Sequence, residues 1–221
     1  MNDRLLLVID KAFELSSLSA ALTLNGTTVV GEARNQSVAI NIFRSMQPDV
    51  VLIDMHCGDE SSVDIAVALR KESATVGVVV LVPCTDLRLI GADISQLPAG
   101  TRLILRSSVN DLTSLCEVIA QSRIFTATDK ASWITSGMSF NDKAANSPFP
   151  GLSDIQVETL RYVADGFTNA EIGRKRFVSE KAVEQMLSRV AMSLNVQPDH
   201  RKNMRVQLVN EYMKWIGAPA R

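Results

Sequence analysis

The sequence has few of the features that mark secreted, metal-binding or membrane proteins. Only three of its 221 residues are cysteines, and Cys57, Cys84 and Cys116 are too scattered for a disulfide framework or a zinc site. No apolar run approaches the ~18 to 20 residues that a membrane-spanning helix needs. The apolar patch near the start is interrupted at Asp10, too early for a signal peptide. We therefore expect a cytoplasmic chain that has no disulfide, no metal site and no membrane contact.

The chain also lacks a large excess of charge of either sign, since its net charge is −1. The two parts differ, however. From residue 151 onward there are 11 Lys or Arg against 8 Asp or Glu, whereas the preceding residues hold 12 against 16. The surplus of positive charge at the C-terminal end has the sign expected of a part that meets phosphates.

Short apolar runs rich in β-branched residues recur through the first half of the chain. They cover residues 5–9, 27–30, 50–53, 76–82 and 102–105. Between them, apolar residues recur at helical spacing, as at Leu15, Leu18 and Leu22. Strands that alternate with helices predict an α/β domain over residues 1–122, a doubly wound five-stranded parallel sheet covered on both faces.

Residues 123–150 are rich in Ser, Ala, Asn and Pro and have no periodicity, which is typical of an interdomain linker. We expect part of this linker, around 124–134, to dock or to form a short helix. Residues 151–221 then have a helical pattern throughout, with Ser153, Asn169 and Ser179 as N-cap candidates. They predict a small all-α domain.

Two short helices joined by a tight turn, the second with a polar face, can place that second helix in a DNA major groove. Residues 152–196 read LSDIQVETLRYVADGFTNAEIGRKRFVSEKAVEQMLSRVAMSLNV. The opening Leu-Ser, the pattern LR..A.G..N.EI and the later SEK.V resemble the LuxR-type helix-turn-helix. The resemblance implies a regulator of transcription that binds double-stranded DNA and is not an enzyme.

The resemblance also assigns roles to single residues. The side chains that it places in the groove are Lys181, Glu184, Gln185, Ser188 and Arg189. Arg174, Lys175 and Arg176, just before the turn, become candidates for phosphate contacts. Glu184 departs from the Lys or Arg usual in the family, and Ala182 replaces the usual Thr. Because a carboxylate repels phosphate, Glu184 either accepts a hydrogen bond from a cytosine amino group or weakens binding.

The last predicted helix, at about 203–216, resembles the helix that pairs two such domains. Leu208, Tyr212 and Trp215 are the candidates for this dimerisation, and the resemblance implies a homodimer. An alternative interpretation is that the same residues close the core of their own domain.

The first part resembles the receiver domain of NarL/FixJ-type response regulators, on VVGEA at 29–33 and PDVVLIDM at 48–55. In a parallel sheet the functional groups gather at the carboxyl ends of the strands. Asp54 ends the third predicted strand, so the resemblance places it at the phosphoacceptor position.

Much of the machinery around that aspartate is replaced. The acidic pair after the first strand is reduced to Asp10 beside Ile9, the hydroxyl position is Val82, and the lysine position is Arg106. Because these residues are poorly suited to hold Mg²⁺ or a phosphoryl group, we expect an atypical receiver that is not controlled by ordinary aspartyl phosphorylation. No cofactor is expected, and Mg²⁺ would be needed only if the receiver is phosphorylated.

Three alternatives remain open. The chain could be a conventional two-component regulator phosphorylated at Asp54, or a regulatory partner protein that binds no DNA. An aspartyl-phosphate phosphatase or transferase is disfavoured because the second carboxylate that such enzymes want is replaced by His56. The target promoters, the direction of regulation and the input signal, whether from a sensor kinase, a small molecule or a protein, are not specified by these motifs.

Overall fold

A computed structural model describes residues 3–55, 61–109, 111–134, 151–197 and 201–216. The chain divides into two compact units. The first unit holds residues 1–83 and 92–140, and the second holds residues 84–91 and 141–221. Among the described residues, no helix is both long and apolar enough to cross a bilayer.

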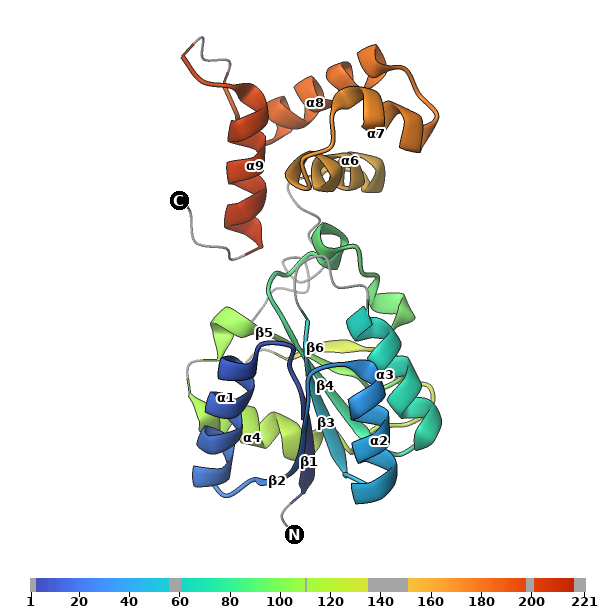
Figure 1. Cartoon of the computed structure of the whole chain (residues 1–221), viewed down its shortest axis with the longest axis vertical. Coiled ribbons are helices and arrows are strands. Elements are labelled where there is room, and N and C mark those ends of the chain that lie inside the picture. Colours follow the sequence, from blue (N-terminus) through green and yellow to red (C-terminus); the bar gives the residue numbers. More distant parts are fainter. Residues whose placement is uncertain (1–2, 56–60, 110, 135–150, 198–200, 217–221) are drawn as a thin grey trace. The chain divides into compact units, whose positions relative to one another are not determined.

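The first unit is built on a parallel sheet (Figure 1). Its strands are β1 (Arg4–Val8), β2 (Thr28–Ala33), β3 (Val50–Asp54), β4 (Gly77–Val82), β5 (Arg102–Leu105) and β6 (Ser132–Ile134). Their order in the sheet is β2-β1-β3-β4-β5-β6, and every pair is parallel. The five strands expected from the sequence are confirmed, and β6 is an additional strand.

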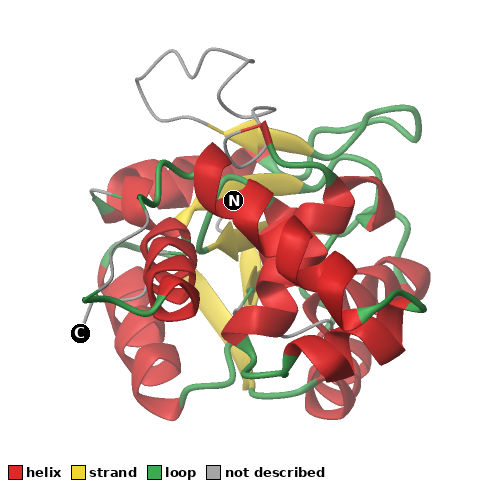
Figure 2. Ribbon diagram, turned by 90° about the horizontal axis from the view of Figure 1, so that it is seen from above, coloured by secondary structure: helices red, strands yellow, loops and turns green. Residues whose placement is uncertain are grey.

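Helices cover both faces of this sheet, which is the yellow layer in Figure 2. They are α1 (Ala12–Leu24), α2 (Gln36–Met46), α3 (Ser61–Glu72) and α4 (Leu112–Gln121). Helices α2 and α3 pack side by side on one face, while α1 and α4 share the other (Figure 1). Every residue of β3 and β4 is buried, as expected of central strands in a sheet covered on both sides. Short 3₁₀ turns, η1 (Leu87–Ile90) and η2 (Ile94–Gln96), replace a helix between β4 and β5.

Part of the predicted linker belongs to the first unit. Ser132–Ile134 pair with β5 as β6, and the Arg102 guanidinium donates to the Ser132 hydroxyl at 2.7 Å. The expectation of a short helix near 124–134 is therefore wrong, and docking takes the form of a strand. The remaining linker residues, 135–150, lie outside the described residues.

The second unit contains the C-terminal helices α6 (Asp154–Ala164), α7 (Asn169–Arg176), α8 (Glu180–Ser193) and α9 (Met204–Trp215). Ser153 and Ser179 are N-caps as expected, whereas α7 is capped by Thr168 in place of Asn169. The apolar faces of the helices form one core. Its buried residues include Val157, Leu160, Val163, Ile172, Val183, Leu187, Val190 and Leu208.

Residues 84–91, from the connection between β4 and β5, complete this second unit. Turn η1 contacts α6, and Leu87, Leu89 and Ile90 are buried. The Arg88 guanidinium forms a two-pronged ion pair with Asp86. Its remaining nitrogen donates to the Leu152 carbonyl at 3.2 Å, and the carboxylate of Asp86 is the main cause that raises the pKa of Arg88. A segment far upstream in the sequence is thus part of the packed C-terminal unit.

Candidate nucleic-acid interface and receiver pocket

Helix α8 has one buried and one exposed face. Val183, Leu187, Val190 and Ala191 recur every three to four residues and are buried. The five side chains predicted to face a groove are all exposed; they are Lys181, Glu184, Gln185, Ser188 and Arg189. The structure therefore brings these five residues onto the free side of one helix, as a helix that reads DNA requires.

The turn between α7 and α8 is tight and hydrogen-bonded. A Cβ at Gly173 would lie only 2.7 Å from the Val178 carbonyl oxygen, so the close approach of the two helices requires glycine there. The Val178 N–H donates to the Gly173 carbonyl at 2.9 Å. Ser179 then accepts from the Ala182 N–H and caps α8. These contacts fix how the first turn of α8 is presented.

The three basic residues before this turn have different environments. Arg174 forms an exposed ion pair with Glu171, a kind of pair that contributes little and is easily exchanged for a phosphate. The Lys175 ammonium lies 4.6 Å from the centroid of the Phe167 ring and is otherwise exposed. Both cations remain able to reach a phosphate.

Arg176 has a different role from the one that we predicted. Its side chain is only 14% exposed and points back to α6. One guanidinium nitrogen donates to the Thr159 hydroxyl at 2.6 Å and to the Ile155 carbonyl at 3.0 Å. Since its donors serve contacts inside the unit, the expectation of a phosphate contact is corrected to a link between α7 and α6.

The three candidates for dimerisation also differ in how exposed they are. Leu208 and Tyr212 are buried, and the Tyr212 hydroxyl donates to the Leu89 carbonyl at 2.7 Å. The structure supports the core interpretation for these two residues, since neither offers a free surface. Trp215, at the C-terminal end of α9, is 41% exposed, and Val206, near the start of the helix, is exposed on the opposite side.

The receiver-like pocket lies at the carboxyl ends of β1, β3, β4 and β5. Asp54 ends β3, its side chain is 3% exposed, and the Arg106 guanidinium forms an ion pair with it. Val82, the last residue of β4, is fully buried. The structure brings Asp54 and Arg106 together as the resemblance implies, but it places an apolar side chain where a hydroxyl would be needed.

Asp10 is exposed after β1, with the neighbouring Ile9 buried. The Arg34 guanidinium donates to the Asp10 carbonyl at 2.7 Å, which adds a second cation to this edge of the sheet. A cavity of about 380 Å³ lies here, lined by residues that include Asp10, Arg34 and Asp54. Among the residues that the structure describes, this edge holds two guanidinium groups, from Arg34 and Arg106, and two carboxylates, from Asp10 and Asp54.

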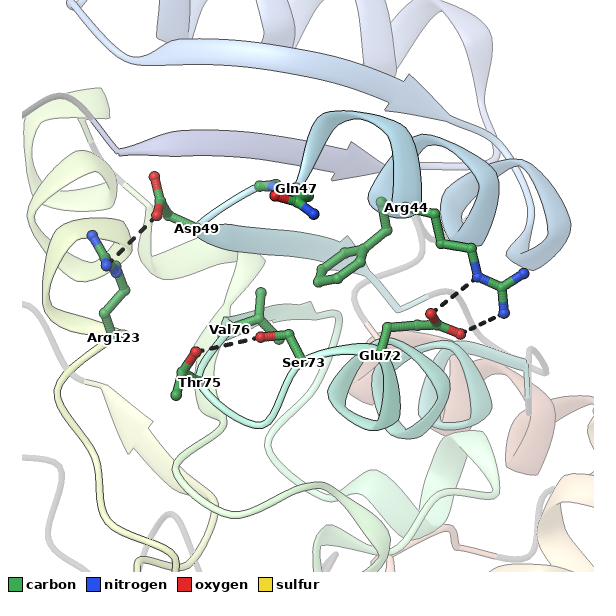
Figure 3. A pocket seen from close by; sticks show the side chains of 10 residues that line it. Arg44, Gln47, Asp49, Glu72, Ser73, Thr75, Val76 and Arg123 are labelled. Atoms are coloured by element: carbon green, nitrogen blue, oxygen red, sulfur yellow. Dashed lines mark hydrogen bonds and ion pairs between the residues drawn. The ribbon is translucent and has the colours of Figure 1, made fainter.

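A second cavity, of about 450 Å³, lies where β3 and β4 begin (Figure 3). At each end of the cavity, an arginine is paired with a carboxylate. Arg44 binds Glu72 at 2.7 Å, and Arg123 lies 3.5 Å from Asp49. The Glu72 pKa is lowered, first of all by the hydrogen bond from Arg44. The cavity holds none of the residues that the sequence singled out.

Sequence reasoning missed two features of the structure. Phe177, in the turn before α8, is 96% exposed. Its only signal was an aromatic residue at a turn position where small or polar residues are preferred. The second is the packing of residues 84–91 with the C-terminal helices, for which a short-range sequence pattern carries no signal.

Comparison with known proteins agrees with this geometry. Residues 150–204 match the family model GerE, which describes bacterial regulatory proteins of the luxR family. A Pseudomonas aeruginosa protein named as a transcriptional regulator is 25% identical over 171 residues, which cover 77% of this chain and 81% of the relative. The DNA-binding transcriptional activator EvgA of Escherichia coli K12 is 20% identical over 189 residues, which cover 86% of this chain and 90% of EvgA.

Among solved structures, RcsB from Salmonella enterica serovar Typhimurium, bound to the promoter rprA in the presence of a phosphomimetic, has a similar fold. The match has a TM-score of 0.53 at 19% identity and covers 96% of this chain and 98% of RcsB. It extends the likeness in fold to both units.

Proposed function

We propose that this chain is a response regulator of the NarL/FixJ type that regulates transcription by placing α8 in the major groove of double-stranded DNA. The match of residues 150–204 to the luxR family model and the similarity to EvgA support the proposal. The observation that carries the proposal is the exposed polar stripe of α8, held above a buried apolar face by a hydrogen-bonded turn. Lys181 and Arg189 supply positive charge, and Gln185 can read a base edge.

Contacts with phosphates come from Arg174 and Lys175. Both are exposed at the end of α7, next to the turn that leads into α8. These contacts position the domain without reading sequence, whereas the side chains of α8 read it. The partly exposed Trp215 at the end of α9 supports binding as a homodimer, in which two copies of α8 meet two half-sites.

The first unit acts as an atypical receiver. Val82 cannot donate a hydrogen bond to a phosphoryl oxygen, and the Arg106 guanidinium already neutralises Asp54. The described residues fit Mg²⁺ poorly, because Asp10 is the carboxylate that they place after β1 near Asp54 and Arg34 adds a cation beside it. The input therefore acts through something other than ordinary phosphorylation of Asp54.

The test is binding of the purified full chain to genomic fragments, followed by fluorescence anisotropy on the selected duplexes at several salt concentrations. Because cations released from phosphates drive such binding, affinity should fall steeply as salt rises. Lys175→Ala should make the slope of log affinity against log salt shallower by about one unit. A chain that selects no fragment at low salt would favour the alternative of a regulatory partner that binds no DNA.

A further inference from the structure

The turn between α7 and α8 exposes an aromatic ring that the helix-turn-helix fold itself does not use. We propose that Phe177 is a further DNA-contacting residue, whose ring packs on the apolar C–H surface of the duplex at the rim of the major groove. This surface is either a thymine methyl group or a deoxyribose. The inference rests on the proposed function and adds an apolar contact to the polar stripe of α8.

Neither packing nor backbone conformation accounts for a phenylalanine at this position. Phe177 is 96% exposed, so the ring buries almost nothing in its own unit. Its φ of 55° lies in the left-handed region, which Gly and Asn adopt at lower cost than a bulky side chain. The domain would thus be at least as stable with Asn at 177. The stability of the fold therefore does not explain the presence of an aromatic ring at this position.

The backbone that carries the ring is nevertheless held in place. The Phe177 N–H donates to the Arg174 carbonyl, and the next residue is fixed by the hydrogen bond from Val178 to Gly173. The left-handed conformation serves as the C-cap of α7. An aromatic side chain has only two rotatable bonds, so on a fixed backbone it loses little conformational entropy on binding, which is why aromatic residues are favoured as anchors in binding surfaces.

The position of Phe177 in the chain indicates that the partner of its ring is DNA. Phe177 lies two residues before Ser179, the N-cap of α8, and four before Lys181. In helix-turn-helix proteins the N-terminal residues of the second helix contact base edges, so a side chain just before them lies at the edge of the groove. Val178 beside it is also exposed, so the apolar surface continues toward α8. Thymine offers a methyl group in the major groove, and apolar side chains are its natural contacts.

The test compares Phe177→Asn and Phe177→Leu with the unaltered full chain. The probe is the duplex that the chain itself selects from genomic DNA, and affinity is measured by anisotropy. Asn suits the left-handed backbone, so Phe177→Asn should keep or raise the melting temperature while affinity falls about threefold to tenfold. Phe177→Leu should restore part of the affinity, because it keeps an apolar side chain. Phe13→Ala, which removes an exposed ring from α1 in the other unit, is the matched control and should leave affinity unchanged.

A second duplex with uracil in place of thymine separates the two sources of apolar surface. If the ring meets a methyl group, the difference between Phe177→Asn and the unaltered chain disappears on the uracil duplex. If it meets deoxyribose, the difference persists.

Equal affinity of Phe177→Asn and the unaltered chain on both duplexes, with Arg189→Ala still weakened, would overturn the inference and leave the proposed function standing. Absence of DNA binding by the unaltered chain would overturn both.

Discussion

At the scale of single residues, the role of an arginine depends on what lies opposite its guanidinium. Arg174 and Arg176 are two residues apart on α7, but one is exposed beside Glu171 and the other reaches Thr159 inside the unit. Arg106 is ion-paired with Asp54 at the edge of the sheet. The residue type alone therefore does not tell whether an arginine is available to bind DNA or links two helices. It also does not tell whether an aspartate is ion-paired.

Arg176→Ala should destabilise the second unit. Removing the guanidinium takes a donor from the exposed Ile155 carbonyl and from the buried Thr159 hydroxyl, and the loss at a buried acceptor is about 1 to 3 kcal/mol. Urea unfolding measures the change, and Lys175→Ala, which removes an exposed cation, serves as the control with little effect on stability. An Arg176→Ala variant with unaltered stability and a shallower salt slope would restore the phosphate contact instead.

At the scale of elements, α8 and residues 84–91 carry different functions in one unit. The periodicity of α8 separates a core face from an exposed polar face within fourteen residues. Residues 84–91 contribute apolar side chains to the C-terminal core, and Tyr212 on α9 is bonded to them. Helix α8 thus exposes its polar face to solvent, while residues 84–91 stabilise the unit to which α8 belongs.

Gln185→Ala and Arg189→Ala should each weaken specific DNA binding while the fold stays intact. A side chain that reads a base edge contributes about 1 to 3 kcal/mol, so the loss should be roughly tenfold. Anisotropy on the selected duplex measures it, and circular dichroism checks the fold. Gln121→Ala, at the exposed end of α4, is the matched control. Full affinity in both variants of α8 would mean that another face of the unit meets DNA.

Tyr212→Phe should lower the free energy of unfolding by about 1 kcal/mol or more, because the Leu89 carbonyl loses its donor in a buried environment. The comparison is Tyr162→Phe, whose half-buried hydroxyl makes a longer bond of 3.3 Å to Glu158. Equal effects in the two variants would argue that the contact with residues 84–91 does not stabilise the unit.

At the scale of the whole molecule, a receiver-like sheet is joined to a helix-turn-helix unit, and we propose that the groups that would transmit a phosphorylation signal are replaced. A ligand shifts an equilibrium only through contacts that differ between two states. At the edge of the sheet, Val82 is apolar and Asp54 is already paired. DNA binding is therefore expected without a phosphodonor.

Acetyl phosphate or phosphoramidate with Mg²⁺ should leave the intact mass of the protein unchanged, and Asp54→Asn should change DNA affinity only slightly. Mass spectrometry of the treated full chain is the measurement. Asp49→Asn, which alters a carboxylate at the opposite edge of the sheet, is a suitable control for affinity. A gain of one phosphoryl group that is absent from Asp54→Asn would establish ordinary two-component control.

Much of the local structure could be predicted because it rests on short-range physics. The strand and helix periods, the caps at Ser153 and Ser179 and the exposed stripe of α8 follow from side chains within a few residues of one another. The strand at 132–134 was missed because three residues carry no measurable period, and only pairing with β5 makes them a strand.

The sequence by itself determined the class of fold, the order of its elements and the residues of α8 that face away from the core, because hydrophobic periodicity and capping act between near neighbours. Tertiary structure alone decided which partner each long side chain meets. Arg176 points into α6, Tyr212 bonds to Leu89, and Phe177 stays exposed. These outcomes depend on groups that packing brings together from distant positions, and a local pattern holds no information about the atoms that will lie opposite.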